Sequence, residues 1–387
     1  MTKEKANFLT IFLPYKDFHF FKDPGQLPYR FQKNFNCKSK LLSFKNGDDY
    51  SVTEKHLQIE FIEKGQSSQR NRNRILWYLI RKGRKIDILN LFHIGWSNFL
   101  VAFIYKVVNP GGFVYLKLDN CFSTGPYKWE DYFSRTGKAG KESIKALLVR
   151  KLLHRSIDLY SVEDEDSKKE YENSYRIFRN KIICSYNGSA YDLAAGKTIA
   201  HKKENIILTV GRLGTYQKAT EVLLEAFASI KDKNDWFLHL AGSIDPAFND
   251  YIENYFKRFP DLSIRVVFEG VLSRSELSSL YSRARIFCLP SRFEGFAIVL
   301  AEAMHFGNAV LTTKNGSLRR IIEGGAGLVV EKDDVKALST ALQHLIVNPA
   351  ITKKFGGHAG DFAAKELNWD TIVQKLHKKM LDKGLCI

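Results

Sequence analysis

Short apolar runs that alternate with helical patterns constrain the fold of this chain more than any other feature. Alternation of this kind is typical of β/α units, whose parallel strands form a doubly wound sheet. Ligands bind such sheets beyond the carboxyl ends of the strands. We therefore predict an α/β protein. The runs in the second half of the sequence are Ile206–Val210, Phe237–Ala241, Ile264–Phe268, Ile286–Leu289, Ala309–Leu311 and Gly327–Val330.

A second series of apolar runs occupies the first half of the chain. Because 387 residues are too many for a single hydrophobic core, we expect two domains. The first spans residues 1–190 and the second residues 203–369, with a linker of small and charged residues between them. The runs of the first half are Phe8–Leu13, Leu41–Phe44, Ile59–Ile62, Ile86–Phe92, Phe113–Leu118, Ile157–Val162 and Lys181–Cys184.

Two glutamates, Glu294 and Glu302, follow the apolar run Ile286–Leu289 and its closing proline. The first lies in a strand-to-helix loop, and the second is expected two turns into the helix. Eight residues at 100° each return the direction to within about 80°, so both carboxylates can face one cleft. The N–H groups at the start of this helix favour a phosphate there. They belong to Gly295, Phe296 and Ala297. Carboxylates beside a phosphate site suit a nucleotide sugar, and the alternative is a solvated helix face.

Two cations share the loop that follows the strand Ile206–Val210. Gly211 and Arg212 come directly after the strand, and Lys218 precedes the next helix. When a glycosyl–phosphate bond breaks, negative charge grows on the diphosphate, and fixed cations stabilise that charge. Arginine offers a planar fork and lysine a point charge. Together they can replace a divalent metal, unless they are only solvated surface.

These two segments resemble the motifs of retaining glycosyltransferases with the GT-B fold, most closely family 4 (group 1). The resemblance covers Glu204 to Trp369 well and the first half loosely. It implies two Rossmann-like β/α/β domains facing a central cleft, with no metal and no cofactor. It also implies that Glu294 holds hydroxyls of the donor sugar and Glu302 the ribose. Glycines usual in the family are replaced by Ala219 and Ala297.

The resemblance carries over to four weaker positions. Leu272, in the turn Gly270-Val-Leu-Ser273 after the run Ile264–Phe268, would lie near the nucleobase. Gly25 would belong to a glycine loop near the reaction centre, or else to an ordinary Pro-Gly turn. Tyr186-Asn-Gly188 resembles the element that ends the first domain, and a last helix at about 370–387 would pack back on that domain.

The histidine that many family members carry near the end of the fifth apolar run is missing here. Asp119 stands at this place and is a candidate substitute or acceptor base. His93 ends another strand and is a second candidate for the cleft. The alternative is that it has only a structural role. Asp164 and Asp166 match the pattern of metal-dependent transferases, but acids at a helix start are favourable on their own account.

The net charge of +17 is concentrated in the first half of the chain. Residues 1–202 contribute +14, chiefly through the clusters 70–85 and 138–155. A basic amphipathic helix suits an anionic membrane surface or a lipid-diphosphate acceptor, and the alternative is a solvated face. No apolar run of 18 residues, no signal peptide and no paired cysteine framework is apparent. We expect a cytoplasmic protein, peripheral at the inner membrane face.

The most economical interpretation is a retaining, metal-independent transferase in cell-surface polysaccharide biosynthesis. It would move a sugar from a nucleotide-diphosphate donor, such as a UDP- or GDP-sugar, to a glycan or lipid-linked acceptor. One alternative is another GT-B activity, such as a sugar-nucleotide epimerase or a phosphorylase. The other is a non-catalytic basic binding protein. No nucleic-acid-binding motif accompanies the charge, so no nucleic-acid partner is expected.

Overall fold

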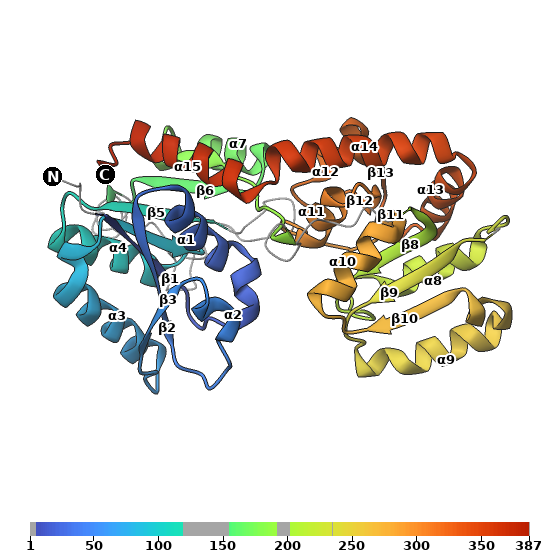
Figure 1. Ribbon diagram of the computed structural model, residues 1–387, viewed down its shortest axis with the longest axis horizontal. Coiled ribbons are helices and arrows are strands. Elements are labelled where there is room, and N and C mark those ends of the chain that lie inside the picture. Colours follow the sequence, from blue (N-terminus) through green and yellow to red (C-terminus); the bar gives the residue numbers. More distant parts are fainter. Residues whose placement is uncertain (1–4, 119–154, 192–201, 234, 387) are drawn as a thin grey trace, which may run out of the picture. The chain divides into compact units, whose positions relative to one another are not determined.

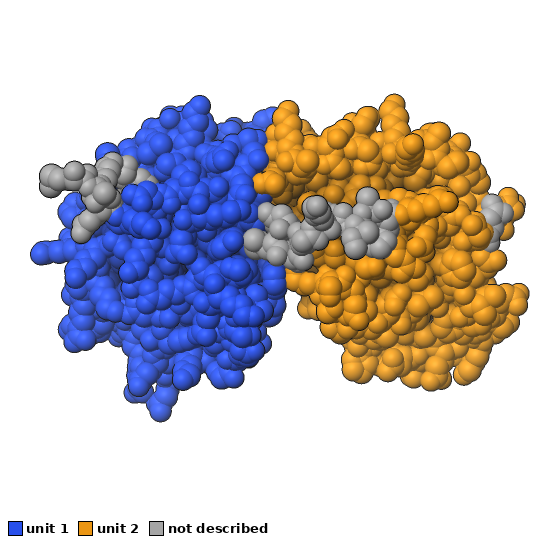
Figure 2. All heavy atoms as spheres, in the orientation of Figure 1, with its two compact units in different colours: residues 1–187, 369–387 blue, residues 188–368 orange. Residues whose placement is uncertain are grey.

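The computed structural model describes residues 5–118, 155–191, 202–233 and 235–386. The chain forms two compact units (Figure 2). Unit 1 contains Met1–Asn187 together with Trp369–Ile387, and unit 2 contains Gly188–Asn368. The candidate Asp119 and most of the basic segment 138–155 lie outside the described residues.

Unit 1 is built on a seven-stranded sheet with the order β3-β2-β1-β4-β5-β6-β7, coloured blue to green in Figure 1. Every described pairing in it is parallel. Each strand coincides with a predicted apolar run, with ends shifted by a few residues. The strands are β1 (Ala6–Ile11), β2 (Cys37–Phe44), β3 (Gln58–Ile62), β4 (Ile88–Phe92), β5 (Phe113–Lys117), β6 (Leu159–Val162) and β7 (Ile182–Cys184).

The longer helices α3 and α4 of unit 1 contribute buried apolar side chains to its core. The core beneath α3 and α4 includes Leu79, Leu89, Phe99 and Val114, and all four are fully buried. Burying such side chains is the main favourable term in folding. The helices are α1 (Asp23–Asn34), α2 (Ser51–Glu54), α3 (Ser68–Lys82), α4 (Trp96–Val108), α7 (Glu165–Ser174) and α15 (Trp369–Asp382).

Helix α15 packs on α1 inside unit 1. The fully buried guanidinium of Arg30 lies 3.0 Å from Asp370, and the exposed ammonium of Lys33 lies 3.2 Å from the same carboxylate. The chain therefore leaves unit 1 after Asn187 and returns to it at Trp369.

The acidic pair at 164 and 166 has a local structural role. Asp164 is the N-cap of α7, and its Oδ1 accepts a hydrogen bond of 2.7 Å from the backbone N–H of Ser167. Such caps satisfy the open N–H groups of a first helical turn. The interpretation of these acids as a helix start is confirmed.

Gly25 does not lie in a loop, which corrects the expectation for this residue. It is the third residue of α1 and is buried. A Cβ atom at this position would lie 2.3 Å from the Cα of Phe20, in the preceding 3-10 helix Asp17–Phe21. The glycine therefore allows two backbone segments to pack together, and we assign it no ligand.

Unit 2 contains a six-stranded parallel sheet with the order β10-β9-β8-β11-β12-β13. Its strands again coincide with the predicted runs. They are β8 (Glu204–Val210), β9 (Phe237–Ala241), β10 (Val266–Gly270), β11 (Ala284–Leu289), β12 (Ala309–Thr313) and β13 (Gly327–Val330). The main helices are α8 (Thr220–Ser229), α9 (Asn249–Arg258), α10 (Arg274–Arg283), α11 (Ile298–His305), α12 (Arg319–Ile321), α13 (Val335–Val347) and α14 (Pro349–Glu366).

The strand order of each sheet reverses once. In unit 1 the reversal lies between β1 and β4, and in unit 2 between β8 and β11. The loops that leave such neighbouring strands run in opposite directions, and ligands bind in the crevice between them. None of the described helices is long and apolar enough to cross a bilayer.

Candidate functional site

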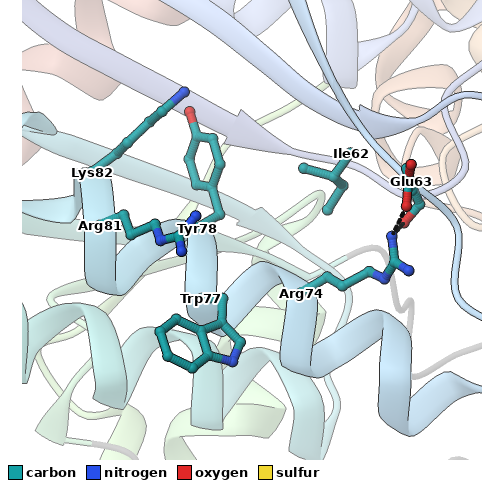
Figure 3. A pocket seen from close by; sticks show the side chains of 7 residues that line it. All are labelled: Ile62, Glu63, Arg74, Trp77, Tyr78, Arg81 and Lys82. Carbon is teal, nitrogen blue, oxygen red and sulfur yellow. Dashed lines mark hydrogen bonds and ion pairs between the residues drawn. The ribbon is translucent and has the colours of Figure 1, made fainter.

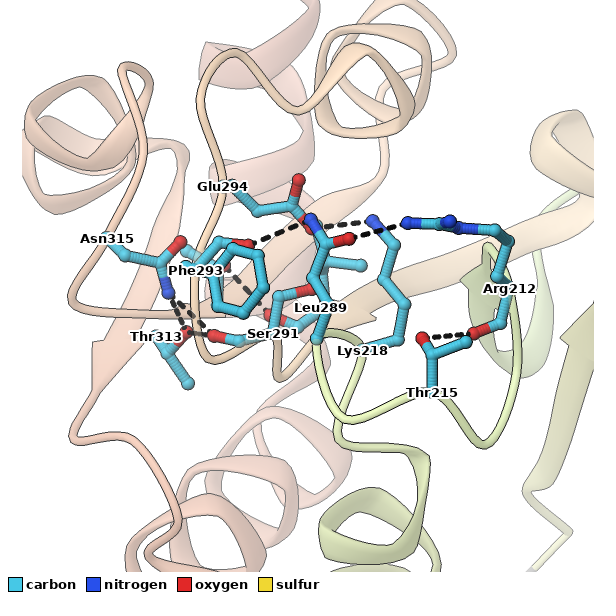
Figure 4. A network of polar contacts seen from close by, with 11 residues as sticks. Arg212, Thr215, Lys218, Leu289, Ser291, Phe293, Glu294, Thr313 and Asn315 are labelled. Carbon is cyan, nitrogen blue, oxygen red and sulfur yellow. Dashed lines mark hydrogen bonds and ion pairs between the residues drawn. The ribbon is translucent and has the colours of Figure 1, made fainter. Parts of the chain in front are cut away.

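The loops that follow β8 and β11 are joined by an ion pair at the point where the strand order reverses. Lys218 Nζ lies 2.6 Å from Glu294 Oε1 (Figure 4). The backbone N–H of Arg292 donates to the carbonyl of Gln217 over 2.8 Å, and the side-chain amide of Gln217 donates to the carbonyl of Phe293 over 3.1 Å. The structure thus brings together two predicted residues 76 positions apart.

Lys218 and Glu294 are largely removed from water. Their side chains are 15% and 9% exposed. Burial of either charge alone is costly, so each one holds the other in place. An ammonium group has three donors, and the bond to Glu294 leaves Lys218 with capacity for a ligand oxygen.

Arg212 is exposed and points along the same loop. Its Nη2 donates to Gln217 Oε1 over 2.8 Å, while Thr215 Oγ1 donates to its carbonyl over 2.9 Å. No carboxylate of the described residues lies within 4 Å of Arg212. Gln217 is neutral, so it orients the guanidinium without cancelling its charge. The sequence analysis did not predict Gln217 as a site residue. Its only signal in the sequence is its position between the two cations.

Small residues allow this loop to turn tightly. A Cβ atom on Gly211 would lie 3.1 Å from Cε of Lys218, so the glycine leaves room for the lysine stem. Ala219 adopts φ 48° and ψ 43°, in the left-handed region. That conformation is strained for a residue with a Cβ. It gives a physical reason why glycine is usual after this lysine in the family that the sequence resembles.

The loop after β11 ends at Ala297, the N-cap of α11. Its φ of −70° suits any residue, so the methyl group that replaces the usual glycine causes no backbone strain. The carbonyl of Gly295 accepts hydrogen bonds from the N–H and the hydroxyl of Ser317, at 3.0 and 3.3 Å. Phe296 lies between these residues, so the three predicted N–H groups stand where α11 begins.

Glu302 is the fifth residue of α11, so it lies little more than one turn into the helix instead of two. Its Oε2 accepts a 3.1 Å hydrogen bond from Tyr281, and its Oε1 lies 3.8 Å from Nη1 of Arg274. Burial and the neighbouring carboxylate raise the pKa of Tyr281 far above its usual value, so the phenol stays a donor. The guanidinium of Arg274 stacks 4.2 Å above the ring of Tyr191.

The two glutamates therefore belong to different clusters. Glu294 joins the β8 loop, whereas Glu302 joins α10, which begins two residues after Leu272. Leu272 is half-buried in the turn between β10 and α10. No sequence motif includes Arg274 or Tyr281. The only signal for them in the sequence was that they belong to the helix that follows the predicted Leu272 turn.

A buried polar network holds the start of the loop that carries Glu294. Asn315 Nδ2 donates to the carbonyl of Ser291 and to Thr313 Oγ1, both at 2.6 Å (Figure 4). Asn315 Oδ1 and Ser291 Oγ are buried and have no hydrogen-bond partner among the described residues. The sequence signal for this network was the turn Lys314-Asn-Gly-Ser317 directly after a strand.

In unit 1, two histidines lie near the reversal of the strand order. His93 follows β4 as predicted, is exposed and adopts φ 62°. Its ring lies 5.7 Å from that of Phe12, which follows β1. His19, which sequence reasoning missed, accepts a 2.9 Å hydrogen bond at Nδ1 from the N–H of Lys16. Burial, with Lys22 and Lys16 nearby, lowers the pKa of His19 to about 4, so it is neutral at pH 7.

Comparisons with known proteins identify what the chain is similar to. Residues 194–360 match the family model described as glycosyl transferases group 1. An uncharacterized glycosyltransferase of Methanocaldococcus jannaschii is 30% identical over 44% of this chain and 43% of its own length. D-inositol 3-phosphate glycosyltransferase of Corynebacterium jeikeium is 30% identical over 46% of this chain and 43% of its own. The chain thus spans less than half the length of these curated relatives.

Two solved structures cover almost the whole chain. A glycosyltransferase of Rickettsia africae superposes with a TM-score of 0.74 at 13% identity, covering 98% of this chain and 99% of its own. Anabaena HepE in complex with UDP superposes with a TM-score of 0.72 at 17% identity, covering 97% and 100%. At such identities the likeness establishes the fold, which is the α/β GT-B architecture.

Proposed function

Residues 194–360 match the family of glycosyl transferases group 1, and from this premise we propose a reaction for the whole chain. We propose a retaining, metal-independent glycosyltransferase. It moves a sugar from a nucleotide-diphosphate donor, such as a UDP- or GDP-sugar, to a glycan or lipid-linked acceptor in cell-surface polysaccharide biosynthesis. The observation that carries this proposal is the Lys218–Glu294 pair beside the uncompensated charge of Arg212.

The two cations serve the leaving group. As the bond between the sugar and the diphosphate breaks, negative charge accumulates on the phosphate oxygens. Arg212 and Lys218 stabilise this charge from fixed positions, as do the N–H groups of Gly295, Phe296 and Ala297 at the start of α11. Gly211 keeps the approach to Lys218 open. We propose that these groups make a divalent metal unnecessary.

The two glutamates serve the two ends of the donor. Glu294, bonded to Lys218, binds hydroxyls of the transferred sugar and so keeps the sugar next to the cations. Glu302, oriented by Tyr281, accepts hydrogen bonds from the ribose. The turn that contains Leu272 contacts the base. The separate clusters of the two carboxylates support this division, since one lies with the cations and the other with α10.

The acceptor side belongs to unit 1. We propose Asp119 as the group that receives or orients the acceptor hydroxyl, with His93 as the described alternative at the carboxyl end of β4. We further propose a peripheral contact with the anionic inner face of the cytoplasmic membrane, where a lipid-linked acceptor would lie.

A panel of UDP- and GDP-sugars tests the donor site through thermal stabilisation of the wild type, Lys218→Met and a control, Lys353→Met. Lys353 is an exposed residue of α14 in the same unit. One sugar nucleotide should stabilise the wild type and the control but not Lys218→Met. Transfer with retained anomeric configuration is then read by NMR of the product. Conversion of the donor to its epimer would instead show an epimerase, and no stabilisation by any donor would refute the site.

A further inference from the structure

The outer face of α3 exposes apolar side chains that a solvated helix would not need. Ile75 and Leu79 face the core, at 7% and 0% exposure. Trp77 and Ile80 face outward, at 61% and 51% exposure. A large exposed aromatic beside an exposed isoleucine is a feature of interaction surfaces more than of ordinary solvated helices.

Cations surround these two side chains. Residues 64–86 include eight lysines and arginines and no aspartate or glutamate. Arg74, Arg81 and Arg84 lie on the outward side of α3 and its 3-10 extension, spaced with Trp77 at intervals of three or four residues. The guanidinium of Arg81 lies 5.7 Å from the centre of the Trp77 ring.

Two adjoining hollows open along this helix. The larger has a volume of 560 Å³ and is lined by Trp77, Arg81 and their neighbours between α3 and the end of β3 (Figure 3). The smaller, of 340 Å³, lies at the amino ends of β1 and β2. Both hollows share Tyr78, Arg81 and Lys82. The smaller adds Lys38, Lys40 and Lys85, and no carboxylate lines it among the described residues.

Part of this charge is already compensated. Glu63 lies 2.7 Å from Arg74, and Glu60 pairs with Lys82. Among the described residues, Arg81, Arg84 and Lys85 form no ion pair. These three cations therefore remain available to an external anion, and they sit at the end of the helix next to the smaller hollow.

We propose that this α3 face, made of Trp77, Ile80, Arg81, Arg84 and Lys85, docks on an anionic phospholipid surface. Tryptophan and isoleucine enter the interface, and the guanidinium and ammonium groups reach the phosphates from their long stems. The exposed apolar pair favours a membrane over nucleic acid. A nucleic-acid backbone attracts cations but offers no apolar surface to an isoleucine, whereas a bilayer offers both phosphates and an apolar interior. The inference rests on the proposed function, because a membrane-docked enzyme meets a lipid-linked acceptor.

The end of α3 with its free cations lies away from the carboxyl ends of the strands in unit 1. The smaller hollow is bordered by Asn7 and Lys38, near the starts of β1 and β2. Phe12 and His93 follow the opposite ends of β1 and β4. Docking through this end of the helix therefore leaves the acceptor-side loops of unit 1 uncovered.

Cosedimentation with phosphatidylglycerol–phosphatidylcholine vesicles, compared with pure phosphatidylcholine, tests the charge. Each cation near an anionic surface contributes roughly a fivefold factor, so R81Q/R84Q/K85Q should lower vesicle binding by about a hundredfold. The control K336Q/K353Q/K354Q removes the same charge from exposed positions of unit 2 and should bind like the wild type. Equal binding of the wild type to both vesicle types, or of both variants to anionic vesicles, would overturn the inference.

Tryptophan fluorescence tests the apolar contact. Emission should shift to the blue when anionic vesicles are added, and W77F should lose this shift while it still cosediments. Loss of binding to a single-stranded RNA in R81Q/R84Q/K85Q, without any vesicle binding by the wild type, would assign the face to nucleic acid instead. Stabilisation by the nucleotide sugar, measured in the same samples, reports on unit 2 alone. Its failure would refute the proposed function independently of vesicle binding.

Discussion

At the scale of single residues, substitutions can separate the structural role of Lys218 from the chemical role that we propose for it. In Lys218→Met the carboxylate of Glu294 stays buried without its cation, which should lower the free energy of unfolding by about 3–5 kcal/mol. Turnover should fall roughly a hundredfold, as when one donor is lost from an oxyanion hole. Chemical denaturation and initial rates measure the two effects.

A double variant separates these roles. Lys218→Met with Glu294→Gln removes the unpaired charge, so it should recover much of the lost stability but none of the turnover. Arg212→Gln should reduce turnover to a similar extent without destabilising the protein, because Arg212 is exposed and its partner is neutral. Full turnover in either single variant would contradict the assignment of these cations to the leaving group.

Glu302 should act on binding more than on the chemical step. A ribose contact exists in both the ground state and the transition state, so Glu302→Ala should raise the Kd for the nucleotide and change kcat little. Tyr281→Phe removes the hydroxyl that orients this carboxylate and should weaken binding about fivefold, the equivalent of one hydrogen bond.

The matched control for Tyr281 is Tyr255→Phe. Tyr255 is also buried in unit 2, but its hydroxyl donates to the carbonyl of Leu224 at 3.0 Å, far in sequence from the Glu302 cluster. Calorimetry with free nucleotide compares the variants. Equal affinities of Tyr281→Phe and Tyr255→Phe would show that the carboxylate needs no such support.

At the scale of elements, the strands were predictable because parallel strands are buried on both faces and appear as short apolar runs. The loops that carry Lys218 and Glu294 followed from the order of strand, glycine and helix. Gly25 was misplaced because Asp23-Pro24-Gly25 suits both a turn and the first turn of a helix. The contact that decides, with the backbone of Phe20, is tertiary.

Other parts of the site had no local signature. Gln217, Tyr281 and Asn315 are common residue types, and their roles depend on partners 21 to 76 residues away. A single sequence shows which residues can donate or accept hydrogen bonds. It does not show which distant strand end each loop will meet.

Gly25 can be tested against another helical glycine. Gly25→Ala should destabilise unit 1 by about 1–3 kcal/mol, because the new methyl group overlaps the backbone of Phe20. Gly357→Ala, in α14, meets no atom within 4 Å and should stabilise the protein by up to about 1 kcal/mol. Turnover per folded molecule should be normal in both. A specific loss of turnover in Gly25→Ala would restore its place near the reaction centre.

At the scale of the whole molecule, the two units share one topology, in which the strand order of a parallel sheet reverses once. No cluster of three or more metal-binding side chains occurs within the described residues. We expect turnover to survive dialysis against a chelator, because Arg212, Lys218 and the start of α11 provide the positive charge. Loss of activity with rescue by manganese or magnesium would contradict this prediction.

The return of the chain to unit 1 through α15 offers a final test, because one carboxylate holds two cations of very different burial. Asp370 pairs with Arg30, whose side chain is 0% exposed, and with Lys33, which is 47% exposed. Arg30→Met leaves the buried Gln26 Oε1 without the hydrogen bond from Arg30, which costs about 1–3 kcal/mol, whereas an exposed pair such as that of Lys33 contributes about 0–1 kcal/mol. Arg30→Met should therefore destabilise unit 1 more than Lys33→Met.

Each unit has its own apolar core, so the damage should stay in one of them. In calorimetry, the transition that nucleotide shifts to a higher temperature is assigned to unit 2. Arg30→Met should lower the midpoint temperature of the unit 1 transition and leave that of unit 2 unchanged. The same nucleotide affinity should be measured in Arg30→Met, Lys33→Met and the wild type below the first transition. Equal destabilisation by the two substitutions, or a shift of both transitions together, would mean that α15 is not anchored through Arg30 and that the two cores do not unfold separately.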